Sequence, residues 1–360
     1  MKGPGYWIVN VSLLVKRNSA FAFAMAFAGC GGSAQSAFTP PGSVPPANRS
    51  NVSLGSRVDP TTLFGHLYAA GALVSGSNVR TFVRRYAVRN GIPDRGSDRR
   101  YPGAWAPLAL DSANSLYTVE YLPAAPTVYV YPPNSNKPNR TLTLTCPDGS
   151  CSPQVGALAV DAHGYLYVGY NWVVQSEHCH CALYFSVVWI FAPGATGNAT
   201  PIQTIWIDQG SVITSVGGLA LHNRDLLVST NGSANAVCTY RTPVTNPTLV
   251  RTLTGPGIVD PYGLAIDHGE VYVANNYGTP GPWFVAAYPV DASGSQYPDR
   301  EIEVSGEKNI GIGIAVKANR LFVPDYIANG VYEVDATKGG AQQPLATLKV
   351  PTAIDVKLGQ

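Results

Sequence analysis

The sequence is poor in charged residues, which make up 13% of its 360 residues, against about 25% in an average domain. Low charge combined with 20 tyrosines excludes an intrinsically disordered chain, which needs the opposite composition. No long run of lysine and arginine is present, so nucleic acid is not expected as a partner. The sequence also lacks a G-x-S-x-G elbow, a phosphate-binding loop and a dinucleotide fingerprint. No apolar stretch is long enough to cross a bilayer as a helix.

Glycine and proline, in contrast, are abundant and spread along the whole chain, with 37 Gly and 29 Pro. Frequent turn residues between segments rich in Tyr and Thr are typical of many short strands joined by turns. The composition therefore favours an all-β protein. A length of 360 residues does not require two domains, because one propeller can exceed the usual domain size.

Residues 1–29 are predicted to be an export signal. Lys16 and Arg17 precede a short apolar run, and small residues follow that run, which is the order found in signal peptides. The segment Phe27-Ala28-Gly29-Cys30 resembles the bacterial lipobox and predicts a lipid on Cys30, which would tether the protein to the cell envelope. The alternative is ordinary cleavage after Ala28, which would leave the protein periplasmic or secreted.

Residues 30–58 are rich in Ser, Pro, Gly and Ala and are predicted to be a flexible tether. Residues 59–360 are predicted to form the folded domain. No membrane contact is expected beyond the lipid, and a monomer is expected.

Short segments recur along the folded domain. A first strand with a central Ala is followed by a tight polar turn, and it appears five times: Pro107–Asp111, Ala157–Asp161, Gly218–His222, Gly263–Asp267 and Gly313–Lys317. A second strand begins at Leu67, Leu116, Leu166, Leu226, Val271 and Leu321. These six starts give a mean period of about 51 residues, which is typical of propeller blades. Third and fourth strands recur as well, so the sequence predicts a six-bladed β-propeller of four-stranded antiparallel blades.

The first unit has a second strand but no first strand. The segment Pro351-Thr352-Ala353-Ile354-Asp355 matches Pro107–Asp111 and is predicted to supply the missing strand. Residues near 352–356 should therefore pair with residues near 67–71, so that the C-terminus closes the ring and hides two sheet edges.

These repeats resemble the NHL-type and gluconolactonase-like six-bladed propellers over roughly residues 60–356. The segment from Phe191 to Pro201 resembles a loop of secreted bacterial propellers of this kind. In gluconolactonase-like enzymes a Glu, an Asn and an Asp hold a divalent cation that polarises the lactone carbonyl. The resemblance implies a corresponding Ca²⁺ or other divalent site at Glu120, Asn275 and Asp325, which end second strands in this sequence. The alternative is that these residues are there because they make turns.

The third unit carries an insertion that contains His178, Cys179, His180 and Cys181. Alternating His and Cys either ligate Zn or Cu or belong to a hairpin tied by a disulfide. Five cysteines follow Cys30, and Cys146–Cys151 is the simplest disulfide among them.

Two functions remain open from the sequence. The first is a non-catalytic scaffold that binds a small molecule, a carbohydrate or a protein on one face. The second is a divalent-cation-dependent lactonase-like hydrolase or lyase with its site in the central channel.

Overall fold

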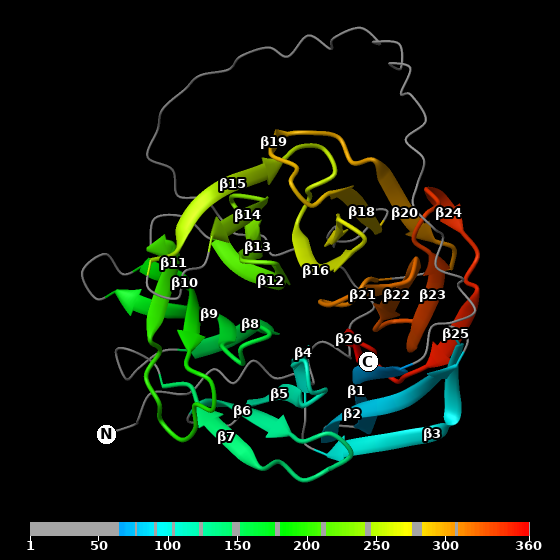
Figure 1. Ribbon diagram of the computed structural model, residues 1–360, viewed down its shortest axis with the longest axis horizontal. Coiled ribbons are helices and arrows are strands. Elements are labelled where there is room, and N and C mark those ends of the chain that lie inside the picture. The colour runs from blue at the N-terminus through cyan, green and yellow to red at the C-terminus, as the bar shows by residue number, and fades with distance from the viewer. Residues whose placement is uncertain are drawn as a thin grey trace, which may run out of the picture.

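The computed structural model of the chain describes residues 65–359, with gaps at 76–77, 90–91, 103–104, 122–124, 146–151, 177–180, 210–213, 242–245, 276–282 and 307–308. The described strands form six sheets arranged as a ring, and no helix occurs among the described residues (Figure 1). None of these residues therefore forms a helix that could span a membrane. The predicted six-bladed β-propeller is confirmed.

The blades follow one another around the ring in sequence order (Figure 1). From the axis outward, blade 1 contains β26 (Asp355–Gly359), β1 (Gly65–Ser75), β2 (Asn78–Arg89) and β3 (Ile92–Pro102). Blade 2 contains β4 (Trp105–Leu110), β5 (Leu116–Tyr121), β6 (Pro126–Tyr131) and β7 (Arg140–Thr143). Blade 3 contains β8 (Ser152–Val160), β9 (Leu166–Ser176), β10 (Cys181–Phe191) and β11 (Gln203–Gln209).

Blade 4 contains β12 (Thr214–His222), β13 (Asp225–Gly232), β14 (Ala236–Arg241), β15 (Thr248–Thr254) and the short β19 (Gly294–Ser295). Blade 5 contains β16 (Pro261–Asp267), β17 (Glu270–Asn275), β18 (Phe284–Pro289), β20 (Arg300–Val304) and β24 (Gly340–Gln342). Blade 6 contains β21 (Ala315–Lys317), β22 (Arg320–Asp325), β23 (Gly330–Asp335) and β25 (Ala346–Lys349). Neighbouring strands are antiparallel, except that β19 and β24 add in parallel to the outer strand of the preceding blade.

The hydrophobic core is divided among the spaces between successive blades. The described residues form six clusters of buried apolar side chains, and each cluster joins residues of two neighbouring blades. The cluster between blades 6 and 1, for example, contains Phe322 and Val331 of blade 6 with Tyr86 and Val356 of blade 1. Every blade packs its apolar side chains against both neighbouring blades. The facing apolar surfaces of blades 6 and 1 are therefore buried only when the ring closes.

Polar turns connect the first strand to the second strand of a blade. In blade 2, Asp111 Oδ1 accepts hydrogen bonds from the backbone N–H groups of Ala113 and Ser115 at 2.9 and 2.7 Å. Asp161 makes the same pair of bonds in blade 3, both at 2.9 Å. These aspartates order a tight turn after the first strands of blades 2 and 3, as the repeated pattern in the sequence predicts.

The C-terminal strand closes blade 1 as predicted, but in a different register. β26 pairs with β1 from His66↔Gly359 to Ala70↔Asp355, whereas the repeat match places Asp355 in the position of Asp111. In the structure Asp355 takes the position of Pro107 instead, and Lys357 takes the position of the central Ala of the other blades. The Pro351–Asp355 match therefore identifies the closing segment but misplaces it by four residues.

Candidate functional site

The three residues predicted to bind a metal end second strands, as expected. Asn275 and Asp325 are the last residues of β17 and β22, and Glu120 is the penultimate residue of β5. Asn275 and Asp325 are fully buried, and Glu120 is half-buried. Their backbone positions are equivalent in three blades, but each side chain has its own local hydrogen-bond partners.

Asn275 forms hydrogen bonds with the loop that precedes β16, the first strand of its own blade. Its Oδ1 accepts a hydrogen bond from the N–H of Val259 at 2.9 Å. Its Nδ2 donates to the carbonyl oxygens of Gly257 at 3.0 Å and of Val273 at 3.2 Å. Both ends of the amide are therefore engaged by the backbone, which is the usual way to satisfy a buried Asn.

Asp325 and Glu120 are also engaged locally. Asp325 Oδ1 accepts hydrogen bonds from the N–H groups of Ile327 and Ala328, at 2.9 and 2.8 Å, and so caps the turn between β22 and β23. Glu120 accepts a hydrogen bond from the Tyr129 hydroxyl, and this bond, with burial and the charge of Glu120, raises the pKa of Tyr129 to about 12.

No group of three His, Cys, Asp or Glu side chains in the described part of the chain is arranged to hold a metal ion. That finding does not cover a site that includes an Asn. The predicted metal site at Glu120, Asn275 and Asp325 therefore stays a prediction. The turn-forming alternative matches the observed hydrogen bonds of Asp325, whereas Asn275 bonds to the loop that precedes β16.

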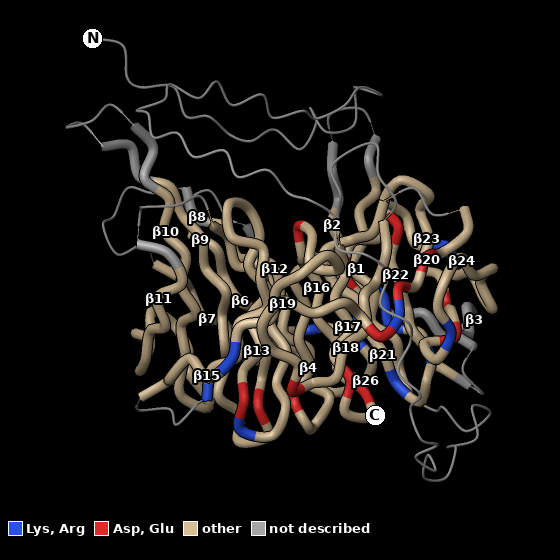
Figure 2. Tube along the Cα trace, turned by 90° about the horizontal axis from the view of Figure 1, so that it is seen from above, with Lys and Arg blue, Asp and Glu red and all other residues tan. Residues whose placement is uncertain are grey.

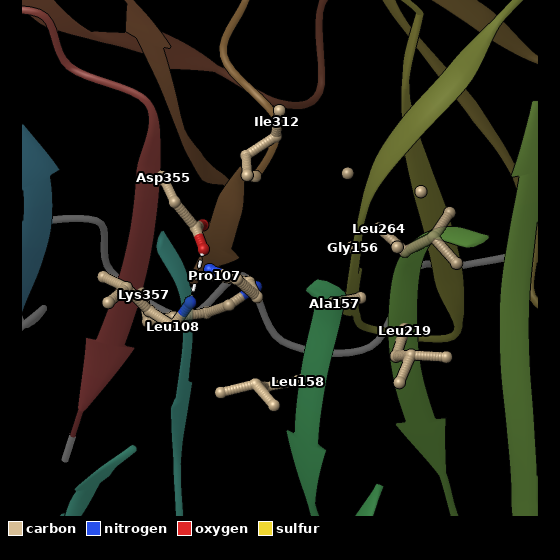
Figure 3. Close-up of a pocket in the computed structure, with 14 residues that line it drawn as sticks. Pro107, Leu108, Gly156, Ala157, Leu158, Leu219, Leu264, Ile312, Asp355 and Lys357 are labelled. Atoms are coloured by element: carbon tan, nitrogen blue, oxygen red, sulfur yellow. Dashed lines mark hydrogen bonds between the residues drawn. The ribbon is translucent and has the colours of Figure 1, made fainter. Parts of the chain in front are cut away.

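A small cavity lies on the axis, between the inner strands of all six blades. Figure 3 shows the residues around it, which come from β4, β8, β12, β16, the segment before β21, and β26. The six equivalent innermost residues are Pro107, Ala157, Gly218, Gly263, Gly313 and Asp355. The cavity leaves about 20 Å³ for the centres of water-sized molecules, which is room for about one or two waters. A sugar lactone does not fit at this level of the channel.

Asp355 is the exception among the six innermost residues, because the other five are small and uncharged. Its Oδ2 accepts a hydrogen bond of 2.7 Å from the N–H of Leu108 in blade 2 (Figure 3). Its Oδ1 has no hydrogen-bond partner and is packed against Gly313 of blade 6, where a Cβ would lie only 1.8 Å from it. Burial raises the pKa of Asp355, while Lys357 and the bonded N–H groups counteract this effect.

The sequence did not identify Asp355 as a residue that helps to close the ring. The signal was present, because a strand that reaches the axis should carry small residues and this one carries Asp and Lys. The hydrogen bond to Leu108, together with that from the Gly313 N–H to the Ile354 carbonyl at 3.3 Å, joins blade 1 to both of its neighbours. We therefore assign Asp355 to the closure of the ring.

Another buried carboxylate lies at the contact between blades 6 and 1. Glu333 is 2% exposed, and Phe322 and Val331, which lie on the same side of blade 6, pack against blade 1. Its Oε1 lies 3.2 Å from Arg320 Nη1, and its Oε2 has no hydrogen-bond partner. Burial raises the pKa of Glu333 to about 7, although the charge of Arg320 lowers it in part.

Aromatic side chains form a continuous column on the side of blade 3 that faces blade 2. Tyr170 stacks on Trp189 with ring centres 4.1 Å apart, and Trp172 stacks on Phe185 at 5.1 Å. Trp206 extends the column outward, 6.1 Å from Trp172. Trp206 is 48% exposed, whereas Trp172 is buried. The insertion predicted in this blade lengthens β9 and β10 to 11 residues each.

Most of the residues in the cysteine predictions lie outside the described part of the chain. Cys30, Cys146, Cys151 and the His178–His180 part of the insertion lie outside the described residues, as does the side chain of Cys181. The one cysteine side chain that the structure describes, Cys238, has no disulfide partner. The lipid on Cys30 and the Cys146–Cys151 disulfide therefore stay predictions.

No protein-family model matches the chain, and no curated protein sequence matches it significantly. Solved structures do resemble it. A chain in the crystal structure of a nidogen/laminin complex has a TM-score of 0.53 and 12% identity, with 82% of this chain and 98% of that chain covered. A putative 6-phosphogluconolactonase from Bacteroides fragilis has a TM-score of 0.48 and 12% identity, covering 83% of this chain and 99% of that one. At such low identity the nidogen likeness supports the propeller fold alone.

Proposed function

We propose that the protein is an exported, lipid-anchored propeller that acts as a non-catalytic scaffold and binds a ligand or partner on one face. The observation that supports this proposal most is the hydrogen bonding of the Asn275 side chain to the backbone. Its amide makes three hydrogen bonds to the backbone, which fix the orientation of the side chain. This use of the amide supports a structural role, as is usual for a buried Asn that is hydrogen-bonded to the backbone.

The axial cavity supports the same conclusion. Only about 20 Å³ of it is open to the centres of water-sized molecules, so at this level it admits water but not a lactone ring, and five of its six innermost residues offer no side chain for acid–base chemistry. The lactonase-like alternative requires Glu120, Asn275 and Asp325 to converge on one cation above this level. Their observed hydrogen bonds weigh against that arrangement.

A thermal shift experiment distinguishes the two functions. Under the scaffold proposal, Ca²⁺, Mg²⁺ or Zn²⁺ should leave the melting temperature of the wild type unchanged, because no folded-state site binds them. Asp325→Asn should lower the melting temperature equally with and without the ions, since Asp325 caps a turn. Asp335→Asn is the matched control, because Asp335 Oδ1 caps a comparable turn through the N–H of Thr337. A rise of several degrees that only Asp325→Asn abolishes would support the lactonase-like alternative.

The anchor is tested separately. Cys30→Ser should move the protein from the membrane fraction to the soluble fraction of a bacterial host, because the lipid is the only expected membrane contact. Cys238→Ser is the control and should fractionate like the wild type. Equal membrane association of wild type and Cys30→Ser would contradict the anchor.

A further inference from the structure

The outer hairpin of blade 1, formed by β2 and β3 (residues 78–102), concentrates positive charge. It holds seven of the 24 Lys and Arg residues of the chain but only two of the 22 Asp and Glu residues. The remainder of the chain has 17 cationic and 20 anionic residues. One hairpin is therefore strongly positive in a protein that is otherwise slightly negative.

The strand register of this hairpin places arginines directly opposite one another. Arg84 of β2 is the partner of Arg100 of β3, and Arg85 is the partner of Arg99. Because neighbouring residues of a strand lie on opposite faces, each face of the blade has one such pair of positions. Like charges at directly opposite positions destabilise a sheet, and a bound anion removes this cost.

On the side of the hairpin next to blade 2, the contacts of Arg85 involve no carboxylate among the described residues. Its Nη1 donates a hydrogen bond of 2.9 Å to Oδ1 of Asn134, which is a neutral amide. Its Nε is buried and has no hydrogen-bond partner in the described part of the chain. Asn134 belongs to the connection between β6 and β7, residues 132–139, whose single charged residue is Lys137. The neighbouring blade therefore adds positive charge here.

Several arginines of other blades are paired with carboxylates. In blade 4, Arg241 and Arg251 share Asp225 at 3.3 and 3.2 Å, and blue and red segments meet there (Figure 2). In blade 6, Arg320 lies 3.2 Å from Glu333. The hairpin of blade 1 differs, because its two aspartates cannot neutralise seven arginines.

The position and composition of the hairpin indicate which anion it fits. β3 is the last strand of its sheet and lies at the outer rim of the ring (Figure 1), where a long polymer can reach it. All seven cations are Arg, whose planar guanidinium binds oxyanions through two parallel hydrogen bonds. The aromatic residues Phe82, Tyr86 and Tyr101 are buried, so none offers a free ring on which a nucleic-acid base could stack.

We propose that the outer hairpin of blade 1 binds an acidic polysaccharide through its arginines. Such a polymer carries a carboxylate or sulfate group on successive sugars, so one chain supplies several anions to the successive cations of β2 and β3. Charge complementarity with several groups at once favours a polymer over a single small anion. The inference goes beyond the proposed function, because the hairpin lies on the outer rim, and it depends on neither the lipid nor a divalent ion.

Fluorescence anisotropy of labelled dextran sulfate, titrated with the purified full chain, tests the proposal. The wild type should bind dextran sulfate but not neutral dextran of the same length. Its Kd should rise steeply as NaCl is raised from about 20 to about 300 mM, because salt screens the charges. Arg85→Gln/Arg99→Gln removes one cross-strand pair and should weaken binding by about tenfold or more.

Arg241→Gln/Lys338→Gln is the matched control, because it removes the same charge from side chains that are 58% and 69% exposed in other blades. This control should bind dextran sulfate like the wild type, since it leaves the hairpin intact.

The melting temperature of each variant establishes whether it is folded. If Arg85→Gln/Arg99→Gln fails to fold, the comparison of Arg99→Gln with Lys338→Gln decides alone. A wild type that does not bind dextran sulfate at the lowest salt overturns the proposal, and so does equal weakening in the hairpin variant and its control. Single-stranded DNA of equal charge is the competing probe, and tighter binding to DNA than to dextran sulfate overturns the choice of a polysaccharide.

Discussion

A chain that ends at Val350 is expected to aggregate or to melt far below the full-length protein. The deletion removes β26, the inner strand of blade 1, and with it the partner of β1 from His66 to Ala70. It exposes the apolar space between blades 6 and 1, from which the fully buried Val356 is lost. It also removes the Asp355 carboxylate that accepts the hydrogen bond of the Leu108 N–H.

The size of this effect follows from the buried groups. Val356 and the partly buried Leu358 contribute about 1.5–3 kcal/mol each when buried, and the uncovered edge of β1 adds a template for aggregation. A total loss of about 3–6 kcal/mol is a large share of the 5–15 kcal/mol that stabilises a typical domain. Thermal melting and light scattering of the truncated chain measure both consequences.

A circular permutant is the control for this deletion. Its chain begins at Pro351, joins Gly359 to Gly65 through a short turn, and ends at Val350. It retains β26 beside β1, so it should melt close to the wild type. If the truncated chain melts like the wild type, β26 does not close the ring in solution.

Glu333→Gln is expected to remove a pH dependence of stability that the wild type shows between about pH 4.5 and pH 7. The pKa of Glu333 in the folded protein is about 7, above its ordinary value of 4.5. As the pH rises through this window, the unfolded chain releases a proton that the folded protein retains, so the free energy of unfolding falls. A shift of this size corresponds to about 3 kcal/mol, whereas Gln carries no titratable proton.

Urea denaturation at pH 4.5 and pH 8 checks this prediction. The wild type should lose about 2–3 kcal/mol more between the two conditions than Glu333→Gln does. Asp355, whose pKa is also raised by burial, is present in both proteins and cancels in the difference. Glu301→Gln, at an exposed position of β20, is the control and should follow the wild type. Equal losses in wild type and Glu333→Gln would show that Glu333 is not held in its protonated form.

The propeller was predictable because its repeats carry the same physical requirement in every blade. Ala109, Ala159, Ala220, Ala265 and Ala315 occupy equivalent places on the inner strands, where space near the axis is limited. The closing strand breaks this pattern with Asp355 and Lys357, and the register of closure was misplaced for that reason. A pattern of small residues cannot locate a strand that carries charged residues at these positions instead.

The candidate site was less predictable from the sequence. The position of Asn275 at the end of β17 could be read from the repeat, but its hydrogen bonds to Val259 and Gly257 depend on how a preceding loop folds back.

Lactone hydrolysis by the purified protein tests the proposed scaffold function most directly. A panel of sugar lactones is incubated with the wild type in the presence of Ca²⁺, Mg²⁺ or Zn²⁺, and hydrolysis is followed by the release of protons. The scaffold proposal predicts no hydrolysis above the rate of buffer with the same ions. Turnover that requires a divalent ion, and that Asp325→Asn abolishes while Asp335→Asn retains it, would contradict the proposal.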